Sequence, residues 1–103
     1  MINSQKLEEI KERIVRAVSP EKIILFGSYA RENATEESDI DLLVVWDTAL
    51  NHHERNLYLD GLFDNRDFPL DIFAFTKDEF KKFKDMPGTM LYEASHYGKL
   101  IYG

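Results

Sequence analysis

Cysteine is absent from the 103 residues of this chain, which excludes disulfide bonds, thiolate catalysis and a thiolate zinc site. Long hydrophobic runs are also absent, and the longest, Leu42 to Trp46, is far too short to span a bilayer. No apolar run follows the first charges of the N-terminus, so we expect no signal peptide and a cytoplasmic protein. Repeats, linkers and low-complexity tracts are missing as well, and we expect a single domain over residues 1–103.

Positive charge is scarce. The chain has 13 Lys and Arg against 19 Asp and Glu, which gives a formal net charge of −6. A protein that binds nucleic acid in general does so by neutralising phosphates, so this balance argues against that class. The short apolar runs likewise lead us to expect no membrane partner. A metal ion and a few backbone amides could still handle phosphate locally. The chain also lacks a long glycine-rich P-loop.

Hydrophobic residues make up 44% of the chain, enough to build the core of one domain. Their spacing predicts helices that alternate with short strands, and this order favours an α/β fold in which helices flank a small, largely parallel or mixed sheet. The predicted helices cover residues 3–18, 52–63, 77–83 and 89–96, and the predicted strands cover 22–26, 39–46 and 68–75. Leu57 is one of the expected apolar positions of the second helix, and Thr76 is a suitable cap for the third.

A glycine and a serine follow the first predicted strand. Glycine lets a backbone approach a ligand closely, and Ser28 is a suitable N-cap for a short helix whose N-terminus would attract phosphate. Gly27 and Ser28 are therefore candidates for a phosphate-binding turn. A simple tight turn with a capped helix explains the same dipeptide, so the dipeptide alone leaves both interpretations open.

Two acids open the second predicted strand, at Asp39 and Asp41. Side chains two apart on a strand share a face, with Cα atoms about 6.6 Å apart. Two carboxylates aimed at one point repel by roughly 3 kcal/mol at about 5 Å and an effective dielectric near 20. Solvent, basic neighbours, a raised pKa or a divalent cation must offset that repulsion, and oxygen ligands suit Mg²⁺ or Mn²⁺. A solvated strand end is the alternative.

A third acid, Asp71, interrupts the apolar pattern of the last predicted strand. An ion pair with Arg66 or Lys77, or an exposed edge position, would account for it. If the two acidic strands are adjacent, however, Asp71 lies beside Asp39 and Asp41 and all three face the Gly-Ser turn. Two-metal phosphoryl transfer needs this arrangement of carboxylates and phosphate-binding turn.

Residues 27–31 (Gly-Ser-Tyr-Ala-Arg) and 38–45 (Ser-Asp-Ile-Asp-Leu-Leu-Val-Val) together resemble the two-part signature of the minimal nucleotidyltransferases. These proteins belong to the DNA polymerase β-like nucleotidyltransferase superfamily. The gap between the two parts fits, and Asp71 falls where the family places its third acid. The resemblance covers nearly the whole chain and implies the nucleotidyltransferase fold, which is like the palm of polymerase β.

The resemblance also implies a role for each acid. Asp39 and Asp41 would ligate two Mg²⁺ ions, with Mn²⁺ as a possible substitute. Asp71 would join this metal site and help to deprotonate the acceptor hydroxyl.

On the nucleotide side, the resemblance implies that Gly27 and Ser28 hold the triphosphate of ATP or another nucleoside triphosphate. Arg31 would lie near the phosphates or support the loop. The sequence departs from the family at Glu32, where members often carry glycine. An extra acid close to the triphosphate could weaken nucleotide binding.

The size of the chain leaves no residues for a domain that cradles the acceptor, so we expect a macromolecular acceptor, most simply a protein. Family members of this size are often antitoxins that neutralise a HEPN-domain toxin, an RNase, by attaching AMP to a tyrosine. Two other functions stay open. One is a binding module of the same fold that blocks its partner by contact, with weak or no catalysis. The other is a transferase for a small hydroxyl compound or an RNA end.

The three aspartates favour the protein-modifying enzyme over the binding module, because a pure binder need not keep acids that repel one another. The missing acceptor domain and the acidic charge disfavour the third function.

Overall fold

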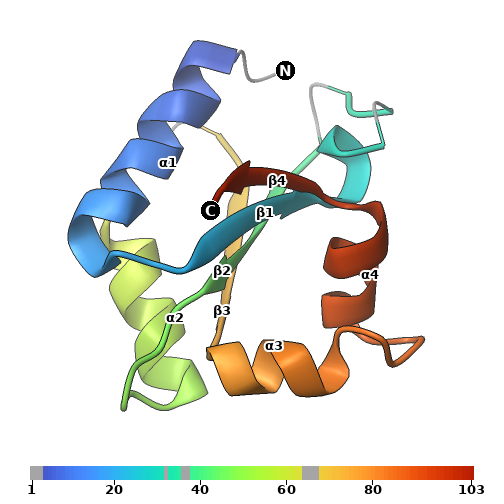
Figure 1. Ribbon diagram of the computed structural model, residues 1–103. Coiled ribbons are helices and arrows are strands. Elements are labelled where there is room, and N and C mark those ends of the chain that lie inside the picture. The colour runs from blue at the N-terminus through green and yellow to red at the C-terminus, as the bar shows by residue number, and fades with distance from the viewer. Residues whose placement is uncertain (1–3, 32, 36–37, 64–67) are drawn as a thin grey trace.

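The structure is a computed structural model that describes residues 4–31, 33–35, 38–63 and 68–103. Helices and strands alternate along most of the chain (Figure 1). The elements are α1 (Ser4–Val18), β1 (Lys22–Phe26), the 3₁₀ turn η1 (Gly27–Tyr29), β2 (Ile40–Val45), α2 (His52–Gly61), β3 (Leu70–Phe75), α3 (Lys77–Phe83), α4 (Met90–Tyr97) and β4 (Lys99–Tyr102). None of the helices in these ranges is long and apolar enough to cross a membrane.

The four strands form one mixed sheet in the order β3-β2-β1-β4. β2 runs parallel to β3, whereas β1 is antiparallel to both β2 and β4. Helices α1 and α2 lie on one side of this sheet, and α3 and α4 lie on the other (Figure 1). The prediction of a small mixed sheet flanked by helices is therefore confirmed.

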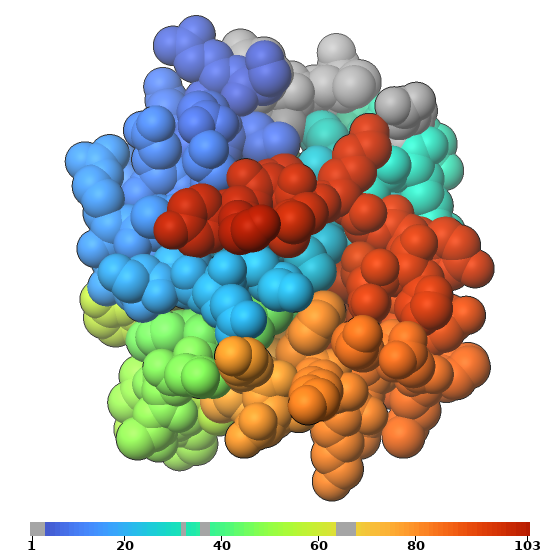
Figure 2. All heavy atoms as spheres, viewed as in Figure 1, coloured from blue at the N-terminus to red at the C-terminus, as the bar shows by residue number. Residues whose placement is uncertain are grey.

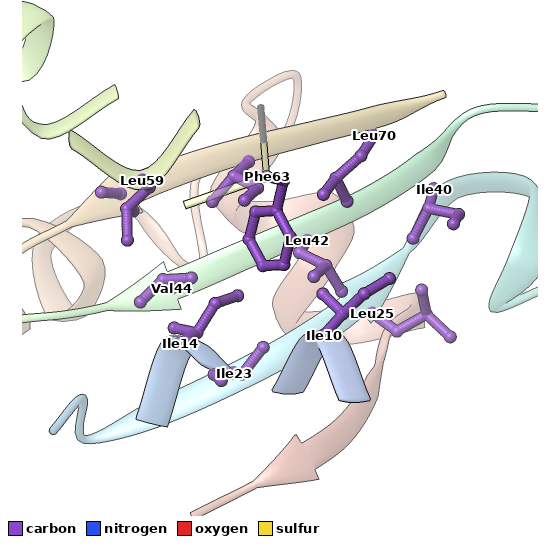
Figure 3. Packing of buried hydrophobic residues seen from close by; sticks show 12 residues of the cluster. Ile10, Ile14, Ile23, Leu25, Ile40, Leu42, Val44, Leu59, Phe63 and Leu70 are labelled. Atoms are coloured by element: carbon purple, nitrogen blue, oxygen red, sulfur yellow. The ribbon is translucent and has the colours of Figure 1, made fainter. Parts of the chain in front are cut away.

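Each face of the sheet has its own hydrophobic core. On the face of α1 and α2, the helix residues Ile10 and Ile14 point onto strand residues such as Leu42 (Figure 3). On the other face, Phe80 and Leu91 pack against β1 and β2. β2 is one of the two inner strands and is covered on both faces, and Leu42 to Val45 are all almost completely buried. This explains why its sequence is uniformly apolar beyond Asp41.

The C-terminal strand β4 was not predicted. Only four residues long, it pairs with β1 at the edge of the sheet, where Figure 2 shows it lying across the surface. Leu100 in this strand is 57% exposed, so the strand has no continuous buried run that a sequence pattern could detect.

The prediction for α2 was partly wrong. Leu57 was expected on its apolar face, but the side chain is 60% exposed, while Arg55 on the same helix is buried. The Arg55 guanidinium donates to the Leu50 carbonyl at 2.7 Å and to Glu79 of α3 at 2.8 Å. These bonds satisfy the buried charge, so this position takes an arginine in place of an apolar residue.

Glu79 links this ion pair to the start of α3. Its carboxylate accepts the Thr76 amide at 2.7 Å as part of a capping box, which confirms Thr76 as the predicted cap. Burial raises the pKa of Glu79, but the hydrogen bonds from Thr76 and Arg55 outweigh burial and leave this pKa below its usual 4.5. The ionised form of Glu79 therefore stabilises the fold.

Candidate active site

The two acidic strands are neighbours, and their register pairs Asp41 of β2 with Asp71 of β3. Adjacent strands lie about 4.8 Å apart, and parallel strands in register place paired side chains on the same face. On its other side, Asp41 is paired with Phe26, the last residue of β1. Asp41 therefore lies between the third acid and the turn that follows β1, as the sequence predicted.

The surroundings of the three acids differ. Asp41 is half-buried, whereas Asp71 is exposed on an edge strand and Asp39 is exposed just before β2 begins. Lys77, one expected partner of Asp71, forms an ion pair with Glu21 at 3.8 Å. Arg66, the other expected partner, lies outside the described residues.

Gly27 touches the Asp41 carboxylate with its backbone. A Cβ atom built on Gly27 would overlap Oδ2 of Asp41, and would lie 3.4 Å from Cγ of the same side chain. Gly27 also has a φ of +75°, in the left-handed region that favours glycine. The backbone conformation thus favours glycine at this position, and any larger residue would also require the Asp41 carboxylate to move.

The neighbouring acids affect the ionisation of Asp41. Burial first, and then the charges of Asp71 and Asp39, together raise the pKa of Asp41 from 3.8 to about 6. Part of the free energy needed to ionise Asp41 is therefore repulsion from these two acids. A divalent cation bound by these oxygens would lower that energy, so the chemistry of the residues fits Mg²⁺ or Mn²⁺.

The acids are close but are not gathered into a ready-made three-ligand site. Across the part of the chain that the structure describes, no group of three or more His, Cys, Asp or Glu side chains is arranged to hold a metal ion. The paired Asp41 and Asp71 are the carboxylates that the register of the sheet brings side by side.

The Gly-Ser turn is tighter than expected. The amides of Ala30 and Arg31 both donate to the Gly27 carbonyl, at 3.1 and 3.2 Å. Ser28 lies inside η1, and Phe26 occupies the N-cap position with no side-chain cap hydrogen bond. The prediction that Ser28 caps a helix is therefore wrong, although the turn itself is where the sequence placed it.

The Arg31 side chain contacts α4. Its guanidinium donates from Nη2 to Oε1 of Glu93 and lies 5.7 Å from the centroid of the Tyr97 ring. No local sequence pattern connects Glu93 or Tyr97 to Arg31, because both lie on a helix more than 60 residues away. Glu32, the departure from the family pattern, lies outside the described residues.

The family described as polymerase beta, nucleotidyltransferase matches this chain over residues 8–103. The chain belongs to this nucleotidyltransferase family. The resemblance to the minimal nucleotidyltransferases is thereby confirmed, and the described fold is the one expected for it.

One solved structure and one further protein support this membership. The crystal structure of a "putative nucleotidyltransferase" from Sulfolobus solfataricus is similar with a TM-score of 0.60 and 26% identity, covering 79% of this chain and 73% of that one. A "putative protein adenylyltransferase" from Methanocaldococcus jannaschii is 64% identical over 31 residues. That matched segment spans only 30% of this chain and 31% of the relative.

Proposed function

We propose that this nucleotidyltransferase transfers AMP from ATP to a hydroxyl group of a protein, and that its acceptor is a HEPN-domain toxin for which it is the antitoxin. The observation that carries the transfer itself is the pairing of Asp41 with Asp71, with the Asp41 carboxylate held against the backbone of Gly27. Acids and turn are thus close enough to act on the same triphosphate.

In this proposal the turn binds the leaving end of the nucleotide. Gly27 allows the triphosphate to approach the backbone, and Ser28 and Arg31 donate hydrogen bonds to its oxygens. The acceptor oxygen attacks the α-phosphorus, the bond from that phosphorus to the bridging oxygen breaks, and pyrophosphate leaves. The hydroxyl proton passes to a carboxylate oxygen of Asp71, which is exposed on the edge strand.

Asp41 and Asp71, with Asp39 at the entrance to β2, are the residues that would hold divalent ions. When bound, such ions supply charge neutralisation for the phosphates and the leaving pyrophosphate. The raised pKa of Asp41 supports this assignment, because repulsion from Asp71 and Asp39 adds to the effect of burial, and a bound cation would offset that repulsion.

The protein acceptor is supported by the name of one relative. The Methanocaldococcus jannaschii relative carries the name of a protein adenylyltransferase, although only part of its length is matched. The HEPN-type partner and the antitoxin role follow from likeness to minimal nucleotidyltransferases alone.

A labelling experiment tests the proposal. The protein is incubated with Mg²⁺, α-labelled ATP and the product of the neighbouring gene as the candidate HEPN-domain partner, and the label on that partner is measured. We expect label with the wild type, a loss of at least about 100-fold in Asp41→Asn and Asp71→Asn, and no change in Asp60→Asn. Asp60 is a matched control because it is an exposed aspartate on α2, a helix that covers the opposite face of the sheet from Asp41 and Asp71.

Unlabelled partner whose RNase activity is nevertheless blocked would refute the transfer reaction. Such a result would establish instead that the protein neutralises its partner by contact. Label on RNA or a small hydroxyl compound, with none on the protein, would refute the acceptor class alone.

A further inference from the structure

The contact between Arg31 and α4 suggests a role for a residue outside the family signature. The backbone of Arg31 is fixed to the turn, since its amide donates to the Gly27 carbonyl at 3.2 Å. Its side chain then reaches α4, which packs directly against η1. Glu93 accepts the hydrogen bond, and the Tyr97 ring lies beside the guanidinium. Two residues of one helix therefore determine where this side chain lies.

Holding an arginine in place matters when it must bind phosphate. A free arginine side chain samples many rotamers, and ordering it costs rotamer entropy. An arginine that is ordered before the ligand arrives spends less of its binding energy on ordering. The guanidinium has five N–H donors, and the contact with Glu93 engages Nη2. The pair can therefore be kept while other donors bind phosphate oxygens.

We propose that Glu93 is a positioning residue for the nucleotide: it holds the Arg31 guanidinium at the rim of the phosphate-binding turn, and so strengthens binding of the triphosphate. This inference rests on the proposed function, because it assumes that Arg31 binds phosphate. It goes beyond that function in assigning part of the nucleotide affinity to a carboxylate on α4.

The sign of the effect separates this role from simple electrostatics. A carboxylate near a triphosphate repels it, so removal of the charge alone would tighten nucleotide binding. If Glu93 instead acts by holding Arg31, its removal weakens binding even though a negative charge has been lost. Glu93→Gln therefore moves the affinity in opposite directions under the two explanations.

The experiment compares the Kd for Mg·ATP by calorimetry, and the KM for ATP in the labelling assay. We expect Glu93→Gln to raise both by about two- to fivefold, the range that one partly exposed ion pair allows, with kcat almost unchanged. Glu93→Asp, which keeps the charge, should lie between Glu93→Gln and the wild type. In an Arg31→Gln background, Glu93→Gln should have no further effect, since no guanidinium is left to hold.

Glu12→Gln is the matched control, because Glu12 forms an ion pair with Arg16 on α1, away from the turn. Glu12→Gln should change the free energy of unfolding in urea about as little as Glu93→Gln does, and it should leave the Kd for Mg·ATP unchanged. Three results would each overturn the inference. The Kd for Mg·ATP could fall in Glu93→Gln, it could equal the Kd of Glu12→Gln, or Glu93→Gln could change the Kd by the same factor with and without Arg31.

The two proposals fail separately. Measuring the Kd for Mg·ATP needs no acceptor. A wild type that binds Mg·ATP without transferring AMP would refute the transfer reaction. The ratio of the Kd of Glu93→Gln to that of the wild type would still decide the role of Glu93.

Discussion

Replacing Gly27 with alanine would test the geometry of the site most directly. The new methyl group meets two obstacles. The backbone of Gly27 has a φ of +75°, and a residue with a Cβ atom pays about 1–2 kcal/mol in this left-handed region. The Cβ atom would also overlap Oδ2 of Asp41, and forcing atoms into an occupied space typically costs about 1–3 kcal/mol. We expect Gly27→Ala to lower the free energy of unfolding by about 2–5 kcal/mol.

Activity should suffer more than stability. The Asp41 carboxylate is the group in the way, so the protein can relieve the overlap only by moving that carboxylate or the turn. A displacement of about 1 Å at a reacting centre can reduce a rate by about 100-fold. We therefore expect AMP transfer by Gly27→Ala to fall by about that factor under conditions where the protein is still folded.

Gly88 provides the control, because its φ of +89° is also left-handed but an added Cβ atom would meet nothing within 4 Å. Urea unfolding of Gly88→Ala therefore measures the backbone cost alone, about 1–2 kcal/mol. The excess cost of Gly27→Ala over Gly88→Ala is the steric conflict with Asp41. In an Asp41→Ala background that excess should disappear. If Gly27→Ala is no more destabilising than Gly88→Ala and still transfers AMP, our account of this contact is wrong.

Three further predictions concern charge. Since the pKa of Asp41 rises from 3.8 to about 6 on folding, the folded state binds this proton more tightly, and ionisation of Asp41 lowers stability as pH rises through that window. Asp41→Asn should abolish transfer. In urea unfolding at pH 7.5 it should nevertheless raise the free energy of unfolding by about 1–2 kcal/mol, a value halved for solvent screening, and at pH 3.5 it should raise it little. An equal increase at the two pH values would contradict this prediction. Glu79→Gln strips the buried Arg55 of its carboxylate and should cost about 2–3 kcal/mol at pH 7. Because the pKa of Glu79 is lowered on folding, its stabilising effect is complete above 4.5 and lost as pH falls through the folded value, so wild type and variant should converge in acid. Asp71→Asn, at an exposed position, should change the unfolding free energy by less than about 0.5 kcal/mol while transfer is lost, and a large loss of stability would show a structural role.

Local sequence patterns were sufficient to predict most of the elements. The apolar run Lys22–Phe26 became β1 with the expected bounds, and Thr76 caps α3 because a threonine followed three residues later by glutamate satisfies two amides at a helix start. The acids at 39 and 41, followed by a wholly apolar stretch, indicated a buried strand with a polar end. These features depend on neighbours in the chain, so periodicity and capping chemistry reveal them.

The sequence alone also determined which residues were candidates for the site, through the spacing of the Gly-Ser turn and the acids. Whether they meet was decided by the tertiary structure, through the strand order and the parallel register that pairs Asp41 with Asp71. The tertiary structure likewise decided the contact of Gly27 with Asp41 and the contact of Arg31 with Glu93. It also decided that Arg55 is buried and Leu57 is exposed. Each joins segments far apart in the chain, and their free energy depends on how whole elements pack, which no local pattern of residues encodes.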